Sequence, residues 1–317
     1  MFGVSICASG GALARGYPTK PVKIVAGFPA GGGADVVARI VAESLTRKTG
    51  GSFVVLNKPG AGAMLAAEEV AKSAPDGYTL LLGSSGELTI APPFYGRSPY
   101  DPVRDFVPIA FLGASPIIML AHPKFPANGI ADIIAQAKAS PGRLTIATGG
   151  HGTPPDLAAR QLKLLAGIDC VIVPYKGGAP AVTDAVAGHV PLVFIPVSTA
   201  LPFVRSGDLK PLAVISKQRS PLLPEVPSTA EAGLDDYAAA SWFGLFGPTS
   251  MPLEIVTQLR EAIGAMMTEP SIREKYAMLG FDLPTPSDTP AALSDRIGIE
   301  LARWTDVIKR SGVKHDG

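Results

Sequence analysis

The stretch VKIVAGFPAGGGAD, residues 22–35, decides the fold of this chain. Its β-branched first part, residues 22–26, predicts a short buried strand. A glycine-rich loop follows, and apolar residues then recur at spacings of three and four from Val37 to Leu45, which predicts a helix. The chain therefore passes from a strand through a glycine-rich loop to a helix N-terminus. Repetition of this unit is typical of an α/β fold with a parallel sheet.

The same alternation of strands, loops and helices continues through both halves of the chain. Further strands are predicted at residues 53–56, 78–82, 144–147, 171–174, 192–195 and 212–215. Helices are predicted at residues 63–72, 155–166, 179–187 and 199–206. The final third is predicted to be helical, with helices that begin at Pro252 and Pro290. Both halves thus repeat one α/β unit, with helices on both faces of the sheet.

Two such units, joined by two crossings of the chain, predict two lobes with a cleft between them. We expect the crossings near residues 118–123 and 222–242. The predicted organisation is a leader at residues 1–14, lobe 1 at 15–120, lobe 2 at 121–225, and a return to lobe 1 with C-terminal helices at 226–317.

The composition narrows the classes of function. Hydrophobic residues make up 47% of the 317-residue chain and charged residues 17%, so we expect a large core and exclude global disorder. The 28 basic residues are balanced by 27 acidic ones, which leaves no surplus to neutralise nucleic acid. The two cysteines and four histidines show no metal-ligand spacing, so we expect neither a zinc site nor a cofactor. Residues 185–204 are uncharged, but three prolines interrupt them, which argues against a spanning helix.

The first 14 residues carry no charge and end in Ala12-Leu13-Ala14. Small residues at these positions mark a secretory cleavage site, here before Arg15, so we predict a signal peptide and a periplasmic protein. The leader lacks the usual positively charged start, so it is short or truncated. The alternative, a cytosolic ligand sensor without a leader, stays open at this point.

Four glycine-rich loops follow predicted strands, at residues 30–35, 83–86, 148–153 and 176–178. Loops at the carboxyl ends of parallel strands gather at one edge of the sheet, where ligands bind. Glycine lets main-chain N–H groups approach an anion, and a helix N-terminus favours negative charge. We therefore predict one small anionic ligand that is held largely by main-chain groups. The alternative is that the glycines only form tight turns.

Two enzymatic interpretations have weaker support. The sequence contains neither a P-loop nor the G-x-G-x-x-G spacing of a dinucleotide site. Ser85 with His151 leaves an α/β hydrolase open, although GSSG at residues 83–86 is not a G-x-S-x-G motif and no acid evidently orients His151. We expect Asp35 to interact with the N-terminus of the first helix instead of taking part in catalysis. We expect Trp242 and Phe243 to pack in the core or at the hinge.

An ordered set of short motifs resembles the Bug family, the periplasmic substrate-binding proteins of tripartite tricarboxylate transporters. The motifs are YPTKPV (17–22), GFPAGGGAD (27–35), NKPGAG (57–62), APDGYTL (74–80), YDPVRDF (100–106), VPYKG (173–177), RSP (219–221), PEVP (224–227) and AEAGL (230–234). Each motif is modest, but their order is specific and covers essentially the whole chain after the leader.

The resemblance implies a two-lobed Venus-flytrap fold of the α/β class, similar to type II periplasmic binding proteins, that closes on a small carboxylated solute. It implies no enzymatic activity and delivery of the ligand to the membrane components of the transporter. We expect a monomer. The ligand-holding loops of the family map by position onto Phe28, Pro29, Ala30, Gly31, Gly32, Ser84, Ser85, Gly86, Thr148, Gly149, Gly150, His151, Thr153, Tyr175, Lys176, Gly177 and, on a nearby strand, Phe194.

The sequence departs from the family pattern at two positions. Phe194-Ile195-Pro196 stands where a pair similar to Asp-Asn often follows the phenylalanine, and His151 stands where small or amide residues are common. The first departure removes a polar group that could bind a ligand amino group. We therefore expect a dicarboxylate, a tricarboxylate or an aromatic carboxylate in preference to an amino acid.

Overall fold

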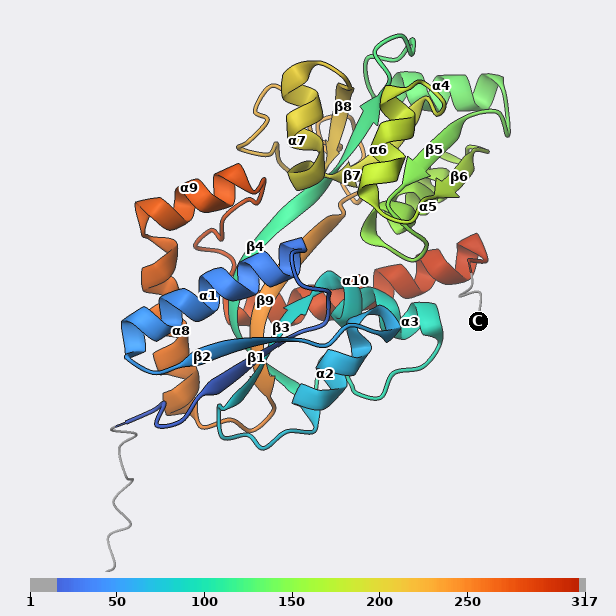
Figure 1. The fold of residues 1–317 in the computed structure, drawn as a ribbon. Helices are drawn as coiled ribbons and strands as arrows, with labels where there is room; N and C mark the ends of the chain where they lie inside the picture. The colour runs from blue at the N-terminus through green and yellow to red at the C-terminus, as the bar shows by residue number, and fades with distance from the viewer. Residues whose placement is uncertain (1–15, 314–317) are drawn as a thin grey trace, which may run out of the picture.

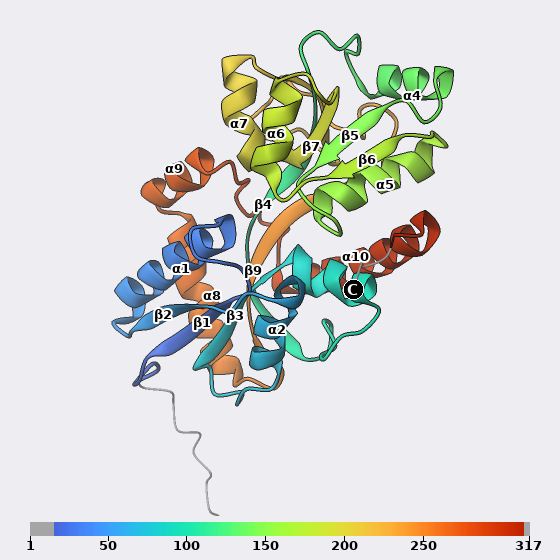
Figure 2. The same ribbon diagram turned by 45° about the vertical axis from the view of Figure 1, so that its right-hand side comes forward.

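The computed structural model describes residues 16–313, so the predicted leader lies outside the described residues. In this part of the chain nine strands form one continuous sheet in the order β2-β1-β3-β9-β4-β7-β5-β6, with β8 beside β4. Figure 1 and Figure 2 show two lobes, one on each half of this sheet, with β4 and β9 running between them. The α/β class and the two-lobed arrangement predicted from the sequence are confirmed.

Lobe 1 is built on a parallel core of β2, β1 and β3, to which β9 adds an antiparallel neighbour. Its strands are β1 (Val22–Ala26), β2 (Phe53–Asn57), β3 (Thr79–Ser84), β9 (Ala240–Pro248) and the first part of β4 (Phe106–Ala121). Its helices are α1 (Gly33–Thr49), α2 (Met64–Ala71), α3 (Ala91–Tyr95), α8 (Leu253–Met267) and α9 (Pro270–Met278). Apolar side chains of α1 and α8 cover one face of the sheet, and those of α2 cover the other.

Lobe 2 repeats the pattern around β7, which has the parallel strand β5 on one side and antiparallel β4 on the other. Its strands are β5 (Thr145–Thr148), β6 (Val171–Pro174), β7 (Leu192–Pro196), β8 (Lys210–Ile215) and the end of β4. Its helices are α4 (Ile130–Ala139), α5 (Pro154–Ala166), α6 (Gly178–Val186) and α7 (Val197–Ser206). The pairs α4/α5 and α6/α7 cover opposite faces.

Within residues 16–313, three connections join the lobes. Strand β4 pairs with β9 over residues 106–116 and then with β7 and β8 over residues 117–121. Strand β9 begins at Ala240, where the chain returns from lobe 2. Helix α10 (Pro290–Ser311) is the third connection, because its first half packs in the core of lobe 1 and its second half, from Trp304, packs in that of lobe 2. The sequence analysis predicted two crossings and did not predict this helical one.

The structure corrects the expected loop at residues 83–86. Gly83 and Ser84 are the last residues of β3, and a π-helical turn, Gly86–Ile90, follows and runs directly into α3. The prolines near the start of α3 are the reason that this helix was not predicted. Proline is nevertheless tolerated in the first helical turn, because N–H groups there have no partner inside the helix. Helices α4 and α9 and the first part of β4, whose register shifts after Pro108, were not predicted from the sequence. None of the helices in residues 16–313 is long and apolar enough to cross a membrane.

Candidate functional site

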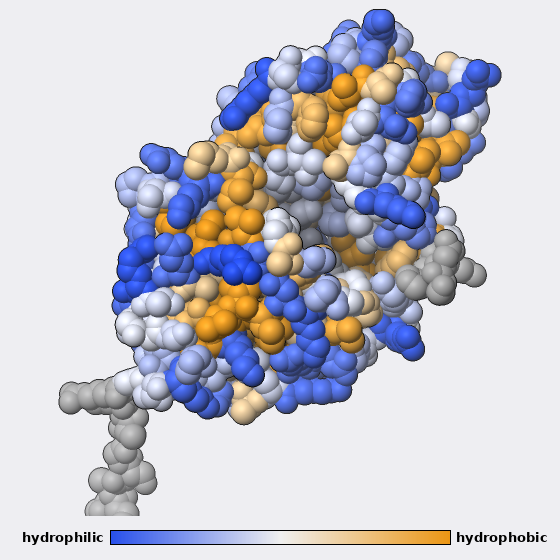
Figure 3. Space-filling view, in the orientation of Figure 1, coloured by the Kyte–Doolittle hydropathy of each residue, from blue (hydrophilic) through white to orange (hydrophobic). Residues whose placement is uncertain are grey.

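A cavity of about 580 Å³ lies between the two lobes. The space-filling view in Figure 3 shows this face of the molecule hollowed at the same level. Residues of both lobes line the cavity, and so do residues of β9, which connects the lobes. A cavity of this volume accommodates a small organic molecule.

Lobe 1 directs two helix starts at the cavity. The first is α1, whose residues Gly32, Gly33 and Ala34 line it. The first intrahelical bond of α1 runs from the Val36 N–H to the Gly32 carbonyl, so the N–H groups of residues 33–35 have no acceptor inside the helix. The second is the turn that begins at Gly86, beside Ser84 and Ser85, although the Gly86 N–H is already bound to Ser84 Oγ at 3.1 Å. Exposed N–H groups and the helix dipole make such ends favourable for an anion.

Lobe 2 also directs two helix starts at the cavity, but they carry fewer donors. The first two residues of α5 are Pro154 and Pro155, which have no N–H group. In α7 the N–H of Ser198 is bound to the Ser115 hydroxyl at 2.9 Å. The N-terminal ends of α5 and α7 are therefore poorer in available main-chain donors than that of α1.

One polar arrangement fixes the loop before α1. The buried carboxylate of Asp35, only 3% exposed, accepts from the Gly31 N–H and from Arg39 Nε, both at 2.9 Å. Its other oxygen accepts from Asn57 Nδ2 at 3.0 Å. The hydrogen bond from Arg39 is the main reason that the pKa of Asp35 is lowered to about 2. Asp35 lies in the first turn of α1, as expected, but its carboxylate binds the preceding loop and does not cap the N–H groups of the helix.

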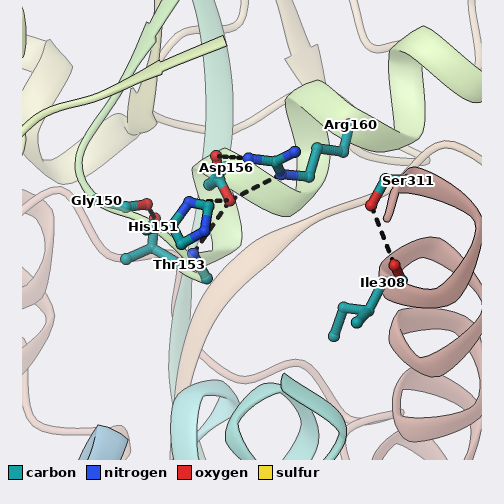
Figure 4. A network of polar contacts seen from close by, with 8 residues as sticks. Gly150, His151, Thr153, Asp156, Arg160, Ile308 and Ser311 are labelled. Atoms are coloured by element: carbon teal, nitrogen blue, oxygen red, sulfur yellow. Dashed lines mark hydrogen bonds and ion pairs between the residues drawn. The ribbon is translucent and has the colours of Figure 1, made fainter. Parts of the chain in front are cut away.

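The loop before α5 repeats this arrangement at the same spacing. The Gly152 N–H donates to Asp156 Oδ2 at 3.1 Å, and Arg160 donates to both carboxylate oxygens, at 3.0 and 3.3 Å. Figure 4 shows Asp156 between Arg160 and His151, whose Nδ1 lies 3.8 Å from Oδ2. Both loops therefore have the pattern G-x-x-x-D-x-x-x-R. The sequence analysis missed Asp156, although this repeat is visible in the sequence and could have identified it.

The lining of the cavity contains no formally charged side chain of the Lys, Arg, Asp or Glu type among residues 16–313. The two arginines of the repeated pattern are bound to their own aspartates and do not line it. Much of the remaining lining is aromatic. The aromatic lining residues besides His151 are Phe28, Phe94, Tyr95, Trp242, Phe243 and Phe281. Trp242 and Phe243, which we expected in the core, are buried there and also line the cavity. The site thus combines main-chain donors with an apolar body.

The structure brings about half of the predicted ligand-binding residues to this cavity. Those that line it are Phe28, Pro29, Ala30, Gly32, Ser84, Ser85, Gly86, His151 and Thr153. Those that the described lining does not include are Gly31, Thr148, Gly149, Gly150, Tyr175, Lys176, Gly177 and Phe194. Phe194 is fully buried in the core of lobe 2, and the Tyr175 hydroxyl donates to Asp184 at 2.7 Å. Contact of any of these residues with a ligand stays a prediction.

Ser85 and His151, the pair of the hydrolase alternative, both line the cavity. Asp156 is an acid close to His151 in the described part of the chain, but the separation of Nδ1 and Oδ2 is too long for a hydrogen bond. Asp156 is already bound by Gly152 and Arg160. Asp156 is therefore not a hydrogen-bond partner of the His151 ring. No group of metal-ligating side chains that could hold an ion occurs in residues 16–313 either.

The two-lobed fold and the cavity between the lobes define a solute-binding protein. Residues 37–313 match the family model of the tripartite tricarboxylate transporter family receptor. This chain belongs to that family, and the resemblance to Bug proteins is confirmed. It is 34% identical to protein BugT of Bordetella pertussis, over 94% of this chain and 91% of that protein.

Two solved structures of relatives contain a ligand. An R. palustris protein with adipate is 33% identical, with a TM-score of 0.78 over 93% of this chain and 98% of that one. MatC from Rhodopseudomonas palustris, with bound malate, is 31% identical, with a TM-score of 0.76 over 92% of this chain and 100% of that one.

Proposed function

We propose that this chain is an extracytoplasmic receptor that captures a small organic carboxylate between its lobes and delivers it to the membrane components of a tripartite tricarboxylate-type transporter. The family supports the transport role, and the relatives with adipate and malate support the ligand class. We further propose that the mature protein works as a monomer in the periplasm and does not convert its ligand chemically.

One observation carries the choice of an anion. The start of α1 places Gly33 and Ala34, whose N–H groups have no acceptor inside the helix, in the lining of a cavity whose described lining holds no formally charged side chain. A carboxylate accepts such donors at a favourable end of the helix dipole, whereas a cation meets the same field as repulsion. We therefore place the carboxylate at lobe 1, between the start of α1 and the turn at Ser85 and Gly86.

The rest of the lining limits the body of the ligand. Phe28, Phe243 and Phe281 come from lobe 1 and the connecting strand, and they offer aromatic surface next to the start of α1. A ligand ammonium group would lose its water without gaining a carboxylate partner, which is unfavourable. We therefore propose a carboxylate with an aliphatic or aromatic body and without an amino group.

Calorimetric titration with a panel of compounds tests this function. The panel contains adipate, malate, benzoate and phthalate, with aspartate, glucose and spermidine as controls from other classes. We expect heat of binding with at least one member of the first group and none with the controls. A ligand that binds only the native state also raises the melting temperature, which provides a second readout. Binding of glucose or spermidine without binding of any acid would contradict the proposal.

The absence of catalysis needs its own measurement. Incubation with ester substrates such as p-nitrophenyl acetate and p-nitrophenyl butyrate should give no turnover above a blank. The hydrolase alternative would be supported if the wild type hydrolysed an ester and both Ser85→Ala and His151→Ala lost this activity. In that outcome neither variant would retain binding of acids.

A further inference from the structure

Glu87 is a buried carboxyl group directly behind the wall of the cavity. It lies in the helical turn Gly86–Ile90 and has an exposed fraction of 0%. Its Oε1 accepts from the Ser84 N–H at 2.5 Å, and its Oε2 accepts from the Ser84 hydroxyl at 2.5 Å. Ser84 itself lines the cavity. None of the ion pairs formed within residues 16–313 includes Glu87, so its charge has no cationic partner there.

The proton of this group is exchangeable near neutral pH. Burial raises the pKa of Glu87 to about 7, although the hydrogen bonds from Ser84 act in the opposite direction. Burial disfavours the ionised form of a carboxyl, and no nearby cation compensates for it. Above this pKa a negative charge therefore stands behind the same wall to which the ligand carboxylate would bind.

The state of Glu87 decides where the Ser84 hydroxyl points. A hydroxyl has one hydrogen and two acceptor sites. When Glu87 is ionised, the hydrogen of Ser84 is donated to Oε2, and Ser84 Oγ accepts from the Gly86 N–H at 3.1 Å. When Glu87 is protonated, its own O–H donates to Ser84 Oγ. Both acceptor sites of Ser84 are then filled, and its hydrogen is released to donate to another acceptor.

We propose that Glu87 and Ser84 couple ligand capture to proton uptake, so that the receptor binds its carboxylate more tightly in the protonated state of Glu87. The proton binds to Glu87 Oε2, and the Ser84 hydroxyl becomes a donor to the ligand carboxylate. This inference rests on the proposed function, since it requires an anionic ligand in the cavity. It adds a positioning residue that does not itself touch the ligand.

Other groups near the turn must be separated from Glu87. Tyr100 donates its hydroxyl to the Glu87 carbonyl oxygen at 2.6 Å. The titratable and charged groups on the elements packed against the turn are Tyr95 on α3, Glu68 and Glu69 on α2, Tyr100 on the loop that follows α3, and Asp295, Arg296, Glu300, Arg303, Asp306, Lys309 and Arg310 on α10. His151 lines the opposite wall of the cavity. Glu300 and His151 are therefore the natural control positions.

The sign of the effect follows from linkage. Ligand charge beside Glu87 raises the pKa of Glu87 further, so the complex binds more protons than the free protein does. The affinity for the ligand is therefore highest below the pKa that Glu87 has in the free protein, and it falls as the pH rises through this pKa. In the limit of full coupling, the dissociation constant rises about tenfold per pH unit above this pKa.

The test uses benzoate and adipate in calorimetric titrations of the full-length protein from about pH 6 to about pH 9. For the wild type we expect a rising dissociation constant, and binding heats that differ between phosphate and Tris buffers because a proton is taken up. Glu87→Gln keeps the shape and mimics the neutral acid, so its affinity should stay near the low-pH value of the wild type and its heats should not depend on the buffer. His151→Asn and Glu300→Gln should retain the pH dependence.

The outcomes separate this inference from the proposed function. If none of the four acids of the panel binds at any pH, the proposed function fails together with the inference. If an acid binds equally well at every pH, or if pH dependence survives in Glu87→Gln and disappears in His151→Asn, only the inference is overturned. Infrared difference spectra of the wild type at alkaline pH provide a readout without a variant, because ligand should produce the band of a protonated carboxyl group. Absence of that band would also overturn the inference.

Discussion

The loops before α1 and α5 share one polar scaffold but present different surfaces to the cavity. In both loops a glycine is followed four residues later by an aspartate, and the aspartate carboxylate accepts from the N–H of that glycine. The carboxylate also accepts from the side chain of an arginine that lies four residues after the aspartate. In lobe 1 the aspartate has Asn57 as its further partner, and the helix start carries N–H groups. In lobe 2 the neighbouring group is His151, and the helix begins with two prolines.

The comparison separates loop stability from ligand recognition. The scaffold holds each loop at the mouth of its helix without any help from a ligand, because all of its bonds are internal. The residues at the first helical positions then decide whether the helix end binds an anion. We therefore propose that lobe 1 carries the anion site and that lobe 2 closes over the rest of the ligand.

The largest expected effect comes from making α1 resemble α5. Gly33→Pro places proline at the first helical position, where its ring is tolerated, and Gly32 before it is already extended with φ −79° and ψ 170°. The substitution removes one N–H group that points at the cavity. A hydrogen bond to a charged group contributes about 1.5–3 kcal/mol, so we expect binding of the best acid in the panel to weaken about 10- to 100-fold in calorimetric titration.

Two matched variants control for added bulk. Gly33→Ala retains the N–H, and its Cβ would lie 3.5 Å from Phe281 Cζ, an ordinary contact. Its affinity should therefore stay close to that of the wild type. Pro154→Ala adds an N–H group at the start of α5 and should not weaken binding. Equal losses in Gly33→Ala and Gly33→Pro would show that space, and not the N–H group, determines affinity.

The second prediction concerns the scaffold of lobe 1. Asp35→Ala removes a buried carboxylate that is the acceptor of the Gly31 N–H and one of two acceptors of the Asn57 amide. Loss of such a partner destabilises a protein by about 1–3 kcal/mol. We expect this decrease in the free energy of unfolding from urea denaturation at neutral pH. Glu43→Ala, an exposed position on the same helix, should change it little.

The same carboxylate predicts part of the acid sensitivity. The pKa of Asp35 is lowered from 3.8 to about 2 in the folded protein, chiefly by its bond to Arg39. A lowered pKa means that its stabilisation is complete above the unfolded value and is lost as the pH falls from about 4 toward about 2. Asp35→Ala should therefore lose less stability than the wild type over this interval. Parallel acid unfolding curves would contradict this account.

The third prediction exchanges the distinctive neighbour of lobe 2. His151→Asn gives the loop before α5 an amide, as Asn57 provides in lobe 1. The His151 ring packs edge-to-face on Phe94 with centroids 5.5 Å apart, and an aromatic pair of this kind contributes about 0.5–1.5 kcal/mol. We expect the affinity for benzoate to fall about 2- to 10-fold by calorimetry. An unchanged or increased affinity would show that His151 does not contribute to the surface that contacts the body of the ligand.

The local parts of this fold could be predicted from the sequence because their signals are local. The β-branched run before α1, the period of α1 and the glycines between them all lie within one stretch of chain. The start of α10 was likewise readable, because Thr289 accepts from the Ala292 N–H at 3.1 Å and caps the helix. Such caps need only neighbouring residues.

Other features could not be predicted because they depend on contacts between distant segments. The partner of β4 changes at residue 117, which no local pattern marks. The burial of Glu87 depends on the fold around the turn. From the sequence alone, Glu87 is only an acidic residue near the start of a helix. The aromatic lining joins Phe94 and Phe281, which are far apart in the chain. For the repeated G-x-x-x-D-x-x-x-R pattern, the residues were visible but their bonds were not.

The smallest expected effect concerns the cation that the sequence placed beside the ligand. Lys176 follows β6 in lobe 2 and is not part of the described lining of the cavity. A lysine that acts from a distance through water contributes little, because exposed charge pairs are worth about 0–1 kcal/mol and salt screens them. We expect Lys176→Ala to change the dissociation constant less than about twofold at physiological ionic strength. Lys210→Ala, in the same lobe on β8, serves as a control for a general change in charge. A tenfold loss in Lys176→Ala alone, with circular dichroism unchanged, would mean that the anion is held by side-chain charge from lobe 2, and the distinction between a donor-rich lobe 1 and a closing lobe 2 would then be wrong.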